Sequence, residues 1–482
     1  MCLLSFMNHA CNVVKIFFFG SMSLFSVIHN HRDLNAIIRV LHDVGGHCYL
    51  VGGCVRDHLL GLESHNFDLE VFGLTSQQII DAIRPHYGID AVGKSYGILK
   101  IRDVDIDIGV PRKEIKTGPL HTDFSVQEAP DLPLNEAIRR RDFTINAIYY
   151  DTKNQQFIDP YGGIEDLKNR RLRPTSERFR EDPLRVLRGM QFCARFELTP
   201  TEETIQASKQ LNPEYLSPER MYQEFVKLLI QGKKISLGLR FLKQTGWTYY
   251  FPEIHNLIGI EQDPFRHPEG DVFEHICHAM DAFATRRTGN LDDDLTVGFA
   301  LLCHDFGKAT TTFRDARGIH SYWHEIAGIL PAKNFMERLG VPKRITLQAL
   351  TLVQYHMEPR RYFKRSASDA DFRRLAYNVR RLDLLVLVGY CDCYGRINNN
   401  EEIFDWISKR AQELGVYKSP PKAIIQGRHL ISIGLHPDKG FSKILLNTYF
   451  AQLNGDFEDV DGGLRYVRKV MLAHNIPTKN GA

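Results

Sequence analysis

Residues 47–57 read His-Cys-Tyr-Leu-Val-Gly-Gly-Cys-Val-Arg-Asp and residues 66–70 read Asn-Phe-Asp-Leu-Glu, and these two stretches decide the predicted fold. An apolar run typical of a strand stops at Gly52 and Gly53, and Arg56 follows three residues later. Glycines after a strand let backbone N–H groups approach a phosphate closely, and an arginine beside them can clamp it. The first stretch therefore predicts a phosphate cradle, with an ordinary turn as the alternative for the glycine pair alone.

The second stretch places two carboxylates on one strand. Asp68 and Glu70 are two residues apart, so both point to the same face and can coordinate one Mg²⁺ ion. Asp105 and Asp107 alternate on a later strand and are candidates for a third carboxylate, although a solvent-facing acid fits equally well. A phosphate cradle beside a two-carboxylate metal site is typical of metal-assisted nucleotidyl transfer, with Asp68 and Glu70 as the catalytic residues.

The composition describes an ordinary globular protein. The chain has 482 residues, enough for about three domains, of which 43% are hydrophobic and 25% charged. Its net charge is only +3, so any surface that binds nucleic acid must be local. The nine cysteines show no paired C-x-x-C spacing, which argues against disulfides and zinc and favours a cytoplasmic location.

The first thirty residues are apolar but interrupted. The runs Val13–Phe19 and Met22–Ile28 are shorter than the roughly 18–20 residues of a membrane span, and no small-residue cleavage site is evident. We therefore expect a disordered leader over residues 1–30 and no membrane partner, with a signal peptide or anchor as the alternative.

Beyond the leader, the hydrophobic pattern predicts an α+β head followed by a long helical body. Helical spacing of apolar residues begins at Leu34, Ile37, Ile38 and Leu41. Short strand-like runs follow up to about residue 151, among them Phe67–Phe72 and Ile145–Tyr150. Residues 113–133 contain several Gly and Pro residues and predict a mobile loop. From about Glu165 onward almost every segment has a helical pattern.

Two further motifs carry regularly spaced charges. Arg139-Arg140-Arg141-Asp142 suits phosphate and ribose contacts, because guanidinium groups bind phosphate bidentately; a basic surface turn is the alternative. In residues 181–188, Asp182, Arg185 and Arg188 are three apart and line one face of a predicted helix. A carboxylate beside a guanidinium can read the edge of a base, whereas the alternative is a surface ion pair of roughly 0.3–0.5 kcal/mol.

These motifs stand in the order found in one enzyme family. The glycine pair with its acidic partners is followed by Arg-Arg-Asp-Phe-Thr-Ile-Asn-Ala (140–147), Asp-Pro-Tyr-Gly-Gly (159–163), the 181–188 helix and Ser-Pro-Glu-Arg (217–220). From about Tyr49 to Lys233 the chain resembles the class II tRNA nucleotidyltransferases and bacterial poly(A) polymerases of the DNA polymerase beta-like superfamily. The resemblance implies a polymerase beta-like nucleotidyltransferase head with a mixed β-sheet.

The resemblance also implies roles for single residues. It assigns nucleotide binding to Gly52, Gly53, Arg56, Arg141, Asp142, Asp182, Arg185 and Arg188. Arg141 would contact phosphate and Asp142 the ribose, while Asp182 and Arg185 would select CTP or ATP. Asp68 and Glu70 would bind the catalytic Mg²⁺, although the family usually has Asp-x-Asp, and the longer Glu70 relaxes the expected geometry. Asp107 fits the family spacing of a third carboxylate better than Asp105.

A second candidate metal site lies in the helical body. His304-Asp305-Phe306-Gly307-Lys308 resembles the signature of the HD superfamily, and His275 and Asp392 would complete its ligand set. Imidazole and carboxylate ligands suit a divalent metal such as Ni, Mn, Co or Fe and a phosphohydrolase centre. His324 and His356 would permit a second ion.

These observations predict a nucleotidyltransferase head over residues 31–152, a helical nucleotide-selecting neck over 153–252, an HD domain over 253–400 and a helical RNA-binding region over 401–482. The resemblance implies addition of CCA to tRNA 3′ ends from CTP and ATP with Mg²⁺, without an obligate protein partner. A poly(A) polymerase is the alternative within the class. The alternatives outside it are an HD phosphohydrolase with a non-catalytic RNA-binding head and a purely structural RNA chaperone.

Overall fold

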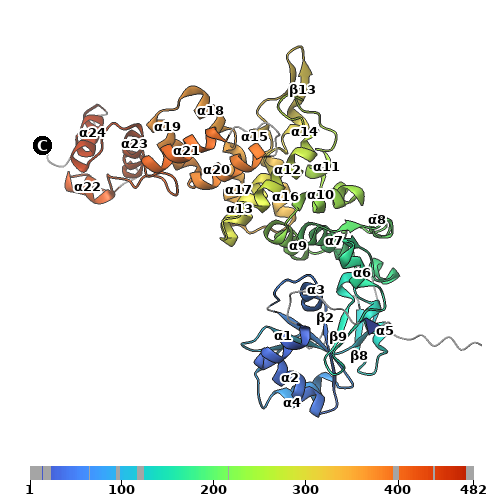
Figure 1. Ribbon diagram of the computed structural model, residues 1–482. Helices are drawn as coiled ribbons and strands as arrows, with labels where there is room; N and C mark the ends of the chain where they lie inside the picture. Colours follow the sequence, from blue (N-terminus) through green and yellow to red (C-terminus); the bar gives the residue numbers. More distant parts are fainter. Residues whose placement is uncertain are drawn as a thin grey trace, which may run out of the picture. The chain divides into compact units, whose positions relative to one another are not determined.

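The computed structural model describes residues 13–14, 23–64, 66–93, 98–116, 124–214, 216–394, 401–437 and 440–473. The chain divides into two compact units (Figure 1), Met1–Leu228 with Leu237–Tyr250, and Leu229–Ser236 with Phe251–Ala482. Within the expected leader, residues 1–12 and 15–22 lie outside the described residues, whereas Leu24–Asn30 form helix α1. The finer division into five segments remains a prediction.

The first unit is built on an eight-stranded mixed sheet. In spatial order its strands are β1 (Val13–Val14), β10 (Gln156–Ile158), β9 (Tyr149–Asp151), β2 (His47–Val51), β3 (Phe67–Phe72), β6 (Ile106–Gly109), β5 (Ile98–Ile101) and β4 (Ile89–Gly93). Strands β3 and β6 pair in parallel, and the other neighbouring strands pair antiparallel. The α+β head with a mixed sheet that the sequence predicts is thus confirmed.

Helices cover this sheet and continue beyond it. They are α1, α2 (Arg32–Asp43), α3 (Gly53–Leu59), α4 (Ser76–Ile83), α5 (Leu134–Arg139), η2 (Thr144–Asn146), α6 (Gly163–Lys168), η3 (Glu177–Glu181), α7 (Leu184–Phe196), α8 (Glu202–Lys209), α9 (Pro218–Gln231), α10 (Ile235–Gln244) and η4 (Trp247–Tyr250). Helix α2 forms because its apolar residues recur every three or four positions and are all buried against α4 and β2, as the spacing predicted. A short pair, β11 (Arg171–Leu172) and β12 (Thr199–Pro200), accompanies them.

Two local predictions differ from the structure. Residues 113–133 include most of an antiparallel hairpin, β7 (Arg112–Lys116) with β8 (Phe124–Glu128), because the Gly and Pro residues that predicted a loop lie between and after the strands. Residues 117–123 lie outside the described part. The predicted strand Ile145–Tyr150 begins as the 3₁₀ turn η2, where α6 approaches so closely that a Cβ on Gly163 would lie 2.1 Å from the Thr144 carbonyl oxygen.

The second unit is helical with one exception. Its helices are α11 (Pro252–His255), α12 (Val272–Ala284), α13 (Leu291–Cys303), α14 (Lys308–Thr311), α15 (His324–Ala327), α16 (Ile329–Arg338), α17 (Lys343–Tyr355), α18 (Glu358–Arg365), α19 (Asp369–Val379), α20 (Leu382–Tyr394), α21 (Glu402–Glu413), α22 (Gly427–Ser432), α23 (Phe441–Asn454) and α24 (Val460–Ala473). The hairpin of β13 (Thr312–Asp315) and β14 (Gly318–Ser321) projects from them (Figure 1), so the expectation of an all-helical body is wrong in this detail. Within the described ranges, no helix is long and apolar enough to cross a membrane.

Candidate active site and metal centre

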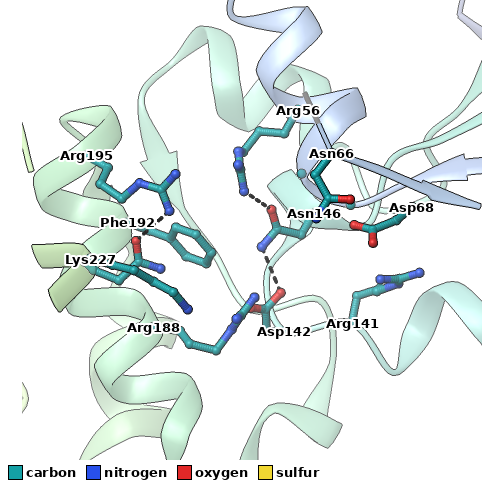
Figure 2. Close-up of a pocket in the computed structure, with 13 residues that line it drawn as sticks. Arg56, Asn66, Asp68, Arg141, Asp142, Asn146, Arg188, Phe192, Arg195 and Lys227 are labelled. Carbon is teal, nitrogen blue, oxygen red and sulfur yellow. Dashed lines mark hydrogen bonds and ion pairs between the residues drawn. The ribbon is translucent and has the colours of Figure 1, made fainter. Parts of the chain in front are cut away.

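The first unit contains a pocket of about 390 Å³ (Figure 2). Its lining residues are Gly52, Gly53, Arg56, Asn66, Asp68, Arg141, Asp142, Asn146, Arg188, Gln191, Phe192, Arg195 and Lys227. The pocket therefore brings together most of the nucleotide-binding residues expected from sequence. Three expected residues, Glu70, Asp182 and Arg185, are not among the described residues that line it.

Gly52 separates a carboxylate from a guanidinium at one side of this pocket. It ends β2 with φ +70°, a left-handed conformation that side chains rarely adopt. A Cβ here would lie 3.6 Å from Oδ2 of Asp68 and 3.7 Å from Nη1 of Arg141. The glycine thus leaves open the space between these two charged groups, as a cradle for an anionic ligand requires.

A chain of hydrogen bonds crosses the pocket from Arg56 to Arg188 (Figure 2). Arg56 Nη1 donates to Asn146 Oδ1 at 2.7 Å, and Asn146 Nδ2 donates to Asp142 Oδ1 at 3.0 Å. Arg188 Nε donates to Asp142 Oδ2 at 2.6 Å. Burial raises the pKa of Asp142, but Arg188 and Asn146 outweigh it and lower the pKa to about 2. Protein groups thus use both oxygens of Asp142, the expected ribose contact.

Asp68 has an environment that suits a metal ligand. Burial raises its pKa, the nearby Asp107 raises it further, and Asp107 faces Asp68 in register across the parallel strands. Among the described residues, no lysine or arginine nitrogen lies within 4.0 Å of the Asp68 carboxylate. Asn66 lines the pocket beside it. Carboxylate and amide oxygens are the hard ligands that Mg²⁺ prefers, so these residues fit such an ion.

Glu70, by contrast, faces a cationic cluster. Its Oε1 accepts from Arg140 Nη2 at 2.9 Å, and its Oε2 accepts from Arg141 Nη2 at 2.9 Å and from the Tyr149 hydroxyl. Only 2% of Glu70 is exposed, and although burial raises its pKa, Arg141 and Arg140 lower it below the ordinary value. Because three donors already occupy both oxygens, this arrangement argues against the expected metal-ligand role of Glu70 and favours the pair Asp68 and Asp107.

The expected base-reading pair has protein partners in this structure. Asp182 accepts from the Leu184 backbone N–H at 3.0 Å and from Arg220 Nη2 at 2.7 Å. Arg185 donates to the carbonyl oxygens of Arg178 at 2.8 Å and Arg140 at 2.7 Å. Both side chains would have to exchange these partners for a base.

Six lining residues were not assigned to the site from sequence: Asn66, Asn146, Gln191, Phe192, Arg195 and Lys227. Phe192 is four residues after Arg188 on α7. The guanidinium carbon of Arg188 lies 5.2 Å from the centroid of the Phe192 ring. Arg195 donates to Gln191 at 3.0 Å, and burial followed by the charge of Arg56 lowers the pKa of Arg195 to about 10. The spacing of three or four residues from Arg188 was the signal that could have identified this face of α7.

The second unit brings together all four residues expected from the HD resemblance. His275 Nε2 lies 2.9 Å from Asp392 Oδ1 and 3.7 Å from Asp305 Oδ2, and His304 Nε2 lies 3.2 Å from the same Asp305 oxygen. All four residues are at most 2% exposed. Nε2 of His304 and Oδ2 of Asp305 are buried without a well-oriented hydrogen bond among the described residues. Oδ2 of Asp305 is nevertheless ion-paired, because Lys308 Nζ lies 2.7 Å from it. Buried imidazoles and carboxylates grouped in this way are a donor set that fits a divalent cation.

His324 and His356 extend this cluster on the other side of Asp305. His324 Nε2 lies 3.3 Å from Asp305 Oδ1 and 3.2 Å from His356 Nε2. The ligand atoms thus form two adjacent groups, His275, His304 and Asp392, and Asp305, His324 and His356. This geometry has the donors for two adjacent ions.

Each imidazole is oriented through its Nδ1 atom. His304, His324 and His356 each contact the carbonyl oxygen three residues earlier, at 2.6, 2.7 and 2.7 Å. His275 Nδ1 instead lies 2.8 Å from Glu269, a buried carboxylate that also contacts His267. Such contacts fix the ring and its tautomer, and leave Nε2 directed at the metal site. Glu269 was not expected; His267-Pro268-Glu269, shortly before His275, was the available signal.

The fold and the pocket define the first unit as a nucleotidyltransferase head, and residues 48–173 match the family model described as the poly A polymerase head domain. The multifunctional CCA protein of Xylella fastidiosa is 35% identical over 325 residues, which cover 66% of this chain and 75% of that protein. That of Aromatoleum aromaticum is 34% identical over 362 residues, covering 72% and 84%. The chain therefore belongs to the family of multifunctional CCA proteins, nucleotidyltransferases that use a divalent metal ion.

Solved structures agree on the fold. The CCA-adding enzyme of Bacillus stearothermophilus in complex with CTP has a TM-score of 0.65 at 20% identity, covering 92% of this chain and 98% of that one. The Thermotoga maritima CCA-adding enzyme complexed with tRNA has a TM-score of 0.57 at 18% identity, covering 93% and 98%. At these identities the likeness shows the fold alone.

Proposed function

We propose that this protein adds C, C and A to the 3′ end of tRNA from CTP and ATP, without a nucleic-acid template and with Mg²⁺. The observation that carries the proposal is the pocket of the head, which is lined by Gly52, Asp68, Arg141 and the hydrogen-bonded residues from Arg56 to Asp142. The chain that forms this pocket belongs to the multifunctional CCA protein family. The proposed cytoplasmic location is supported by the seven described cysteines, which are all buried and form no disulfide.

In this reaction the 3′-hydroxyl oxygen of the RNA forms a bond to the α-phosphorus, and the bond from that phosphorus to the pyrophosphate oxygen breaks. Asp68, with Asp107 and Asn66 beside it, would hold the ion, which would activate the hydroxyl and neutralise phosphate charge. Arg141, whose Nη1 faces the pocket, would bind the phosphates. The hydrogen bonds that link Arg56 to Arg188 through Asn146 and Asp142 would hold the walls of the pocket in fixed positions.

Base choice would fall to Asp182 and Arg185, next to the pocket wall at the start of α7. Their hydrogen-bonding groups match the edges of cytosine and adenine once Arg220 and the two carbonyl oxygens release them. Selection would then depend on a rearrangement at the N-terminus of α7.

The test is incorporation of radiolabelled CTP and ATP into tRNA that lacks its CCA end, with wild type and Asp68→Ala side by side. Addition of C, C and a single A, lost in the variant, supports the proposal. A long tail of A alone would make the protein a poly(A) polymerase. Full incorporation in Asp68→Ala would contradict the metal site of the head, whereas no incorporation by wild type would favour the HD phosphohydrolase with a non-catalytic RNA-binding head.

We further propose that the second unit contains an HD-type metal centre with phosphohydrolase activity. The observation that supports this proposal is the group of buried imidazoles and carboxylates around Asp305. It would hold one or two divalent ions, from the group Ni, Mn, Co and Fe. The test is phosphate release from RNA with a 3′-phosphate end, with each metal, in wild type and His304→Ala. Absence of release with every metal would contradict the hydrolytic role, and calorimetric titration of the metals tests the site itself.

A further inference from the structure

Glu70 is a carboxylate near the pocket of the head that uses both oxygens in contacts with other side chains. It lies on β3, paired with Tyr49 on one side and Gly109 on the other, in the centre of the sheet. Its oxygens accept hydrogen bonds from two guanidinium groups and one hydroxyl. A buried carboxylate gains little from a metal ion when two cations already neutralise it, because the ion would first have to displace them.

The contacts of Arg141 indicate what Glu70 does instead. Arg141 Nη2 donates to Glu70 at 2.9 Å, and its Nε and Nη2 donate to the Tyr149 hydroxyl at 3.3 and 3.2 Å. The guanidinium also lies 5.4 Å from the Tyr149 ring centroid. These contacts hold one edge of the planar group, so the remaining Nη1 is turned to the space beside Gly52 and Asp68.

We propose that Glu70 is a positioning residue that orients Arg141 toward the nucleotide phosphates, and that it is not a ligand of the catalytic metal. This inference rests on the proposed nucleotidyl transfer and assigns a specific role within it. Glu70 also holds Arg140, whose carbonyl oxygen accepts from Arg185 at 2.7 Å. One carboxylate thereby connects the phosphate-binding arginine with a residue expected to choose the base.

The decisive experiment introduces Glu70→Gln into a His304→Ala background, in which the second unit has lost a metal ligand, and compares it with that background in two measurements: the KM for CTP in C addition, and the Mn²⁺ affinity of the protein without nucleotide, by electron paramagnetic resonance. Loss of two charge-assisted contacts should raise the KM about tenfold with kcat changed less than threefold. The Mn²⁺ affinity should stay within twofold of that of the background. A loss of Mn²⁺ affinity like that expected for Asp68→Asn would overturn the proposal.

A double-mutant cycle tests whether Glu70 acts through Arg141. In an Arg141→Lys background, Glu70→Gln should add less than a twofold change in KM, since the oriented guanidinium is already absent. An independent tenfold change would overturn the proposal. Should Glu70→Gln fail to fold, Tyr149→Phe replaces it, with a rise of about threefold in KM expected and an unchanged KM contradicting the inference. Failure of wild type to incorporate CTP would instead reject the proposed function.

Discussion

The ion pair between Asp142 and Arg188 predicts a defined loss of stability in Asp142→Asn. The pKa of Asp142 falls from 3.8 to about 2 on folding, because Arg188 and Asn146 stabilise the charged form in a buried position. One pKa unit corresponds to about 1.4 kcal/mol, so the lowered pKa contributes on the order of 2 kcal/mol to the free energy of unfolding at pH 7. The variant should lose about this amount, since Arg188 keeps its charge without a partner.

The sign of the pH dependence follows from the lowered pKa. The contribution is fully present above pH 3.8, the value of the unfolded chain, and is lost as the pH falls through about 2. The difference in the free energy of unfolding between wild type and Asp142→Asn should therefore be constant between pH 5 and 7. It should become smaller as the pH falls below 4.

The assay is hydrogen–deuterium exchange of peptides from α7, which reports the opening free energy of this helix separately from the second unit. Asp131→Asn, a substitution at an exposed carboxylate, is the matched control. The reasoning is refuted if Asp142→Asn opens α7 no more easily than the control at pH 7. A difference that persists undiminished at pH 2 would refute the electrostatic origin.

Three further predictions concern other parts of the two sites. Asp107→Asn should raise the Mg²⁺ concentration for half-maximal CTP incorporation several-fold, because Asp107 lies opposite Asp68. Asp105→Asn, at an exposed position, is the control and should leave this concentration unchanged. The same effect in both variants would exclude Asp107 from the metal site. Glu269→Gln should weaken Mn²⁺ binding to the second unit about tenfold by calorimetry, with the exposed Glu261→Gln as control, because His275 loses the carboxylate that orients it. Gly163→Ala should lower stability by about 2 kcal/mol or more, because its Cβ would meet the Thr144 backbone; an unchanged melting temperature would contradict the close packing of α6.

The sequence predicted the pocket of the head well because its residues lie in contiguous motifs. The family resemblance grouped Gly52, Asp68 and Arg141 in one site, and all three line the pocket. It could not show that Glu70 would be occupied, since Arg140 and Arg141 reach it from seventy residues further along the chain. Spacing on a strand determines which face a side chain occupies, whereas its partner on that face depends on the tertiary fold.

The residues of the predicted HD site were chosen by type, grouping and resemblance, and the structure brings His275, His304, Asp305 and Asp392 together. Glu269 was missed because it is not one of the metal ligands of the predicted site. It contacts Nδ1 of His275, the ring nitrogen that is turned away from that site. The β13–β14 hairpin was missed because its short strands are interrupted by polar residues within a long helical region. Both lie in connections between helices, where sequence periodicity carries little information.

His304 and His356 occupy the C-terminal caps of α13 and α17, two helices of thirteen residues each. The C-terminal end of a helix carries partial negative charge, so two helix dipoles reinforce the carboxylates around Asp305. The backbone thus adds to the attraction of this centre for cations. Lys308 and Arg360 already lie 2.7 and 3.2 Å from its carboxylates, so an ion that binds there would compete with these two side chains as well as with water.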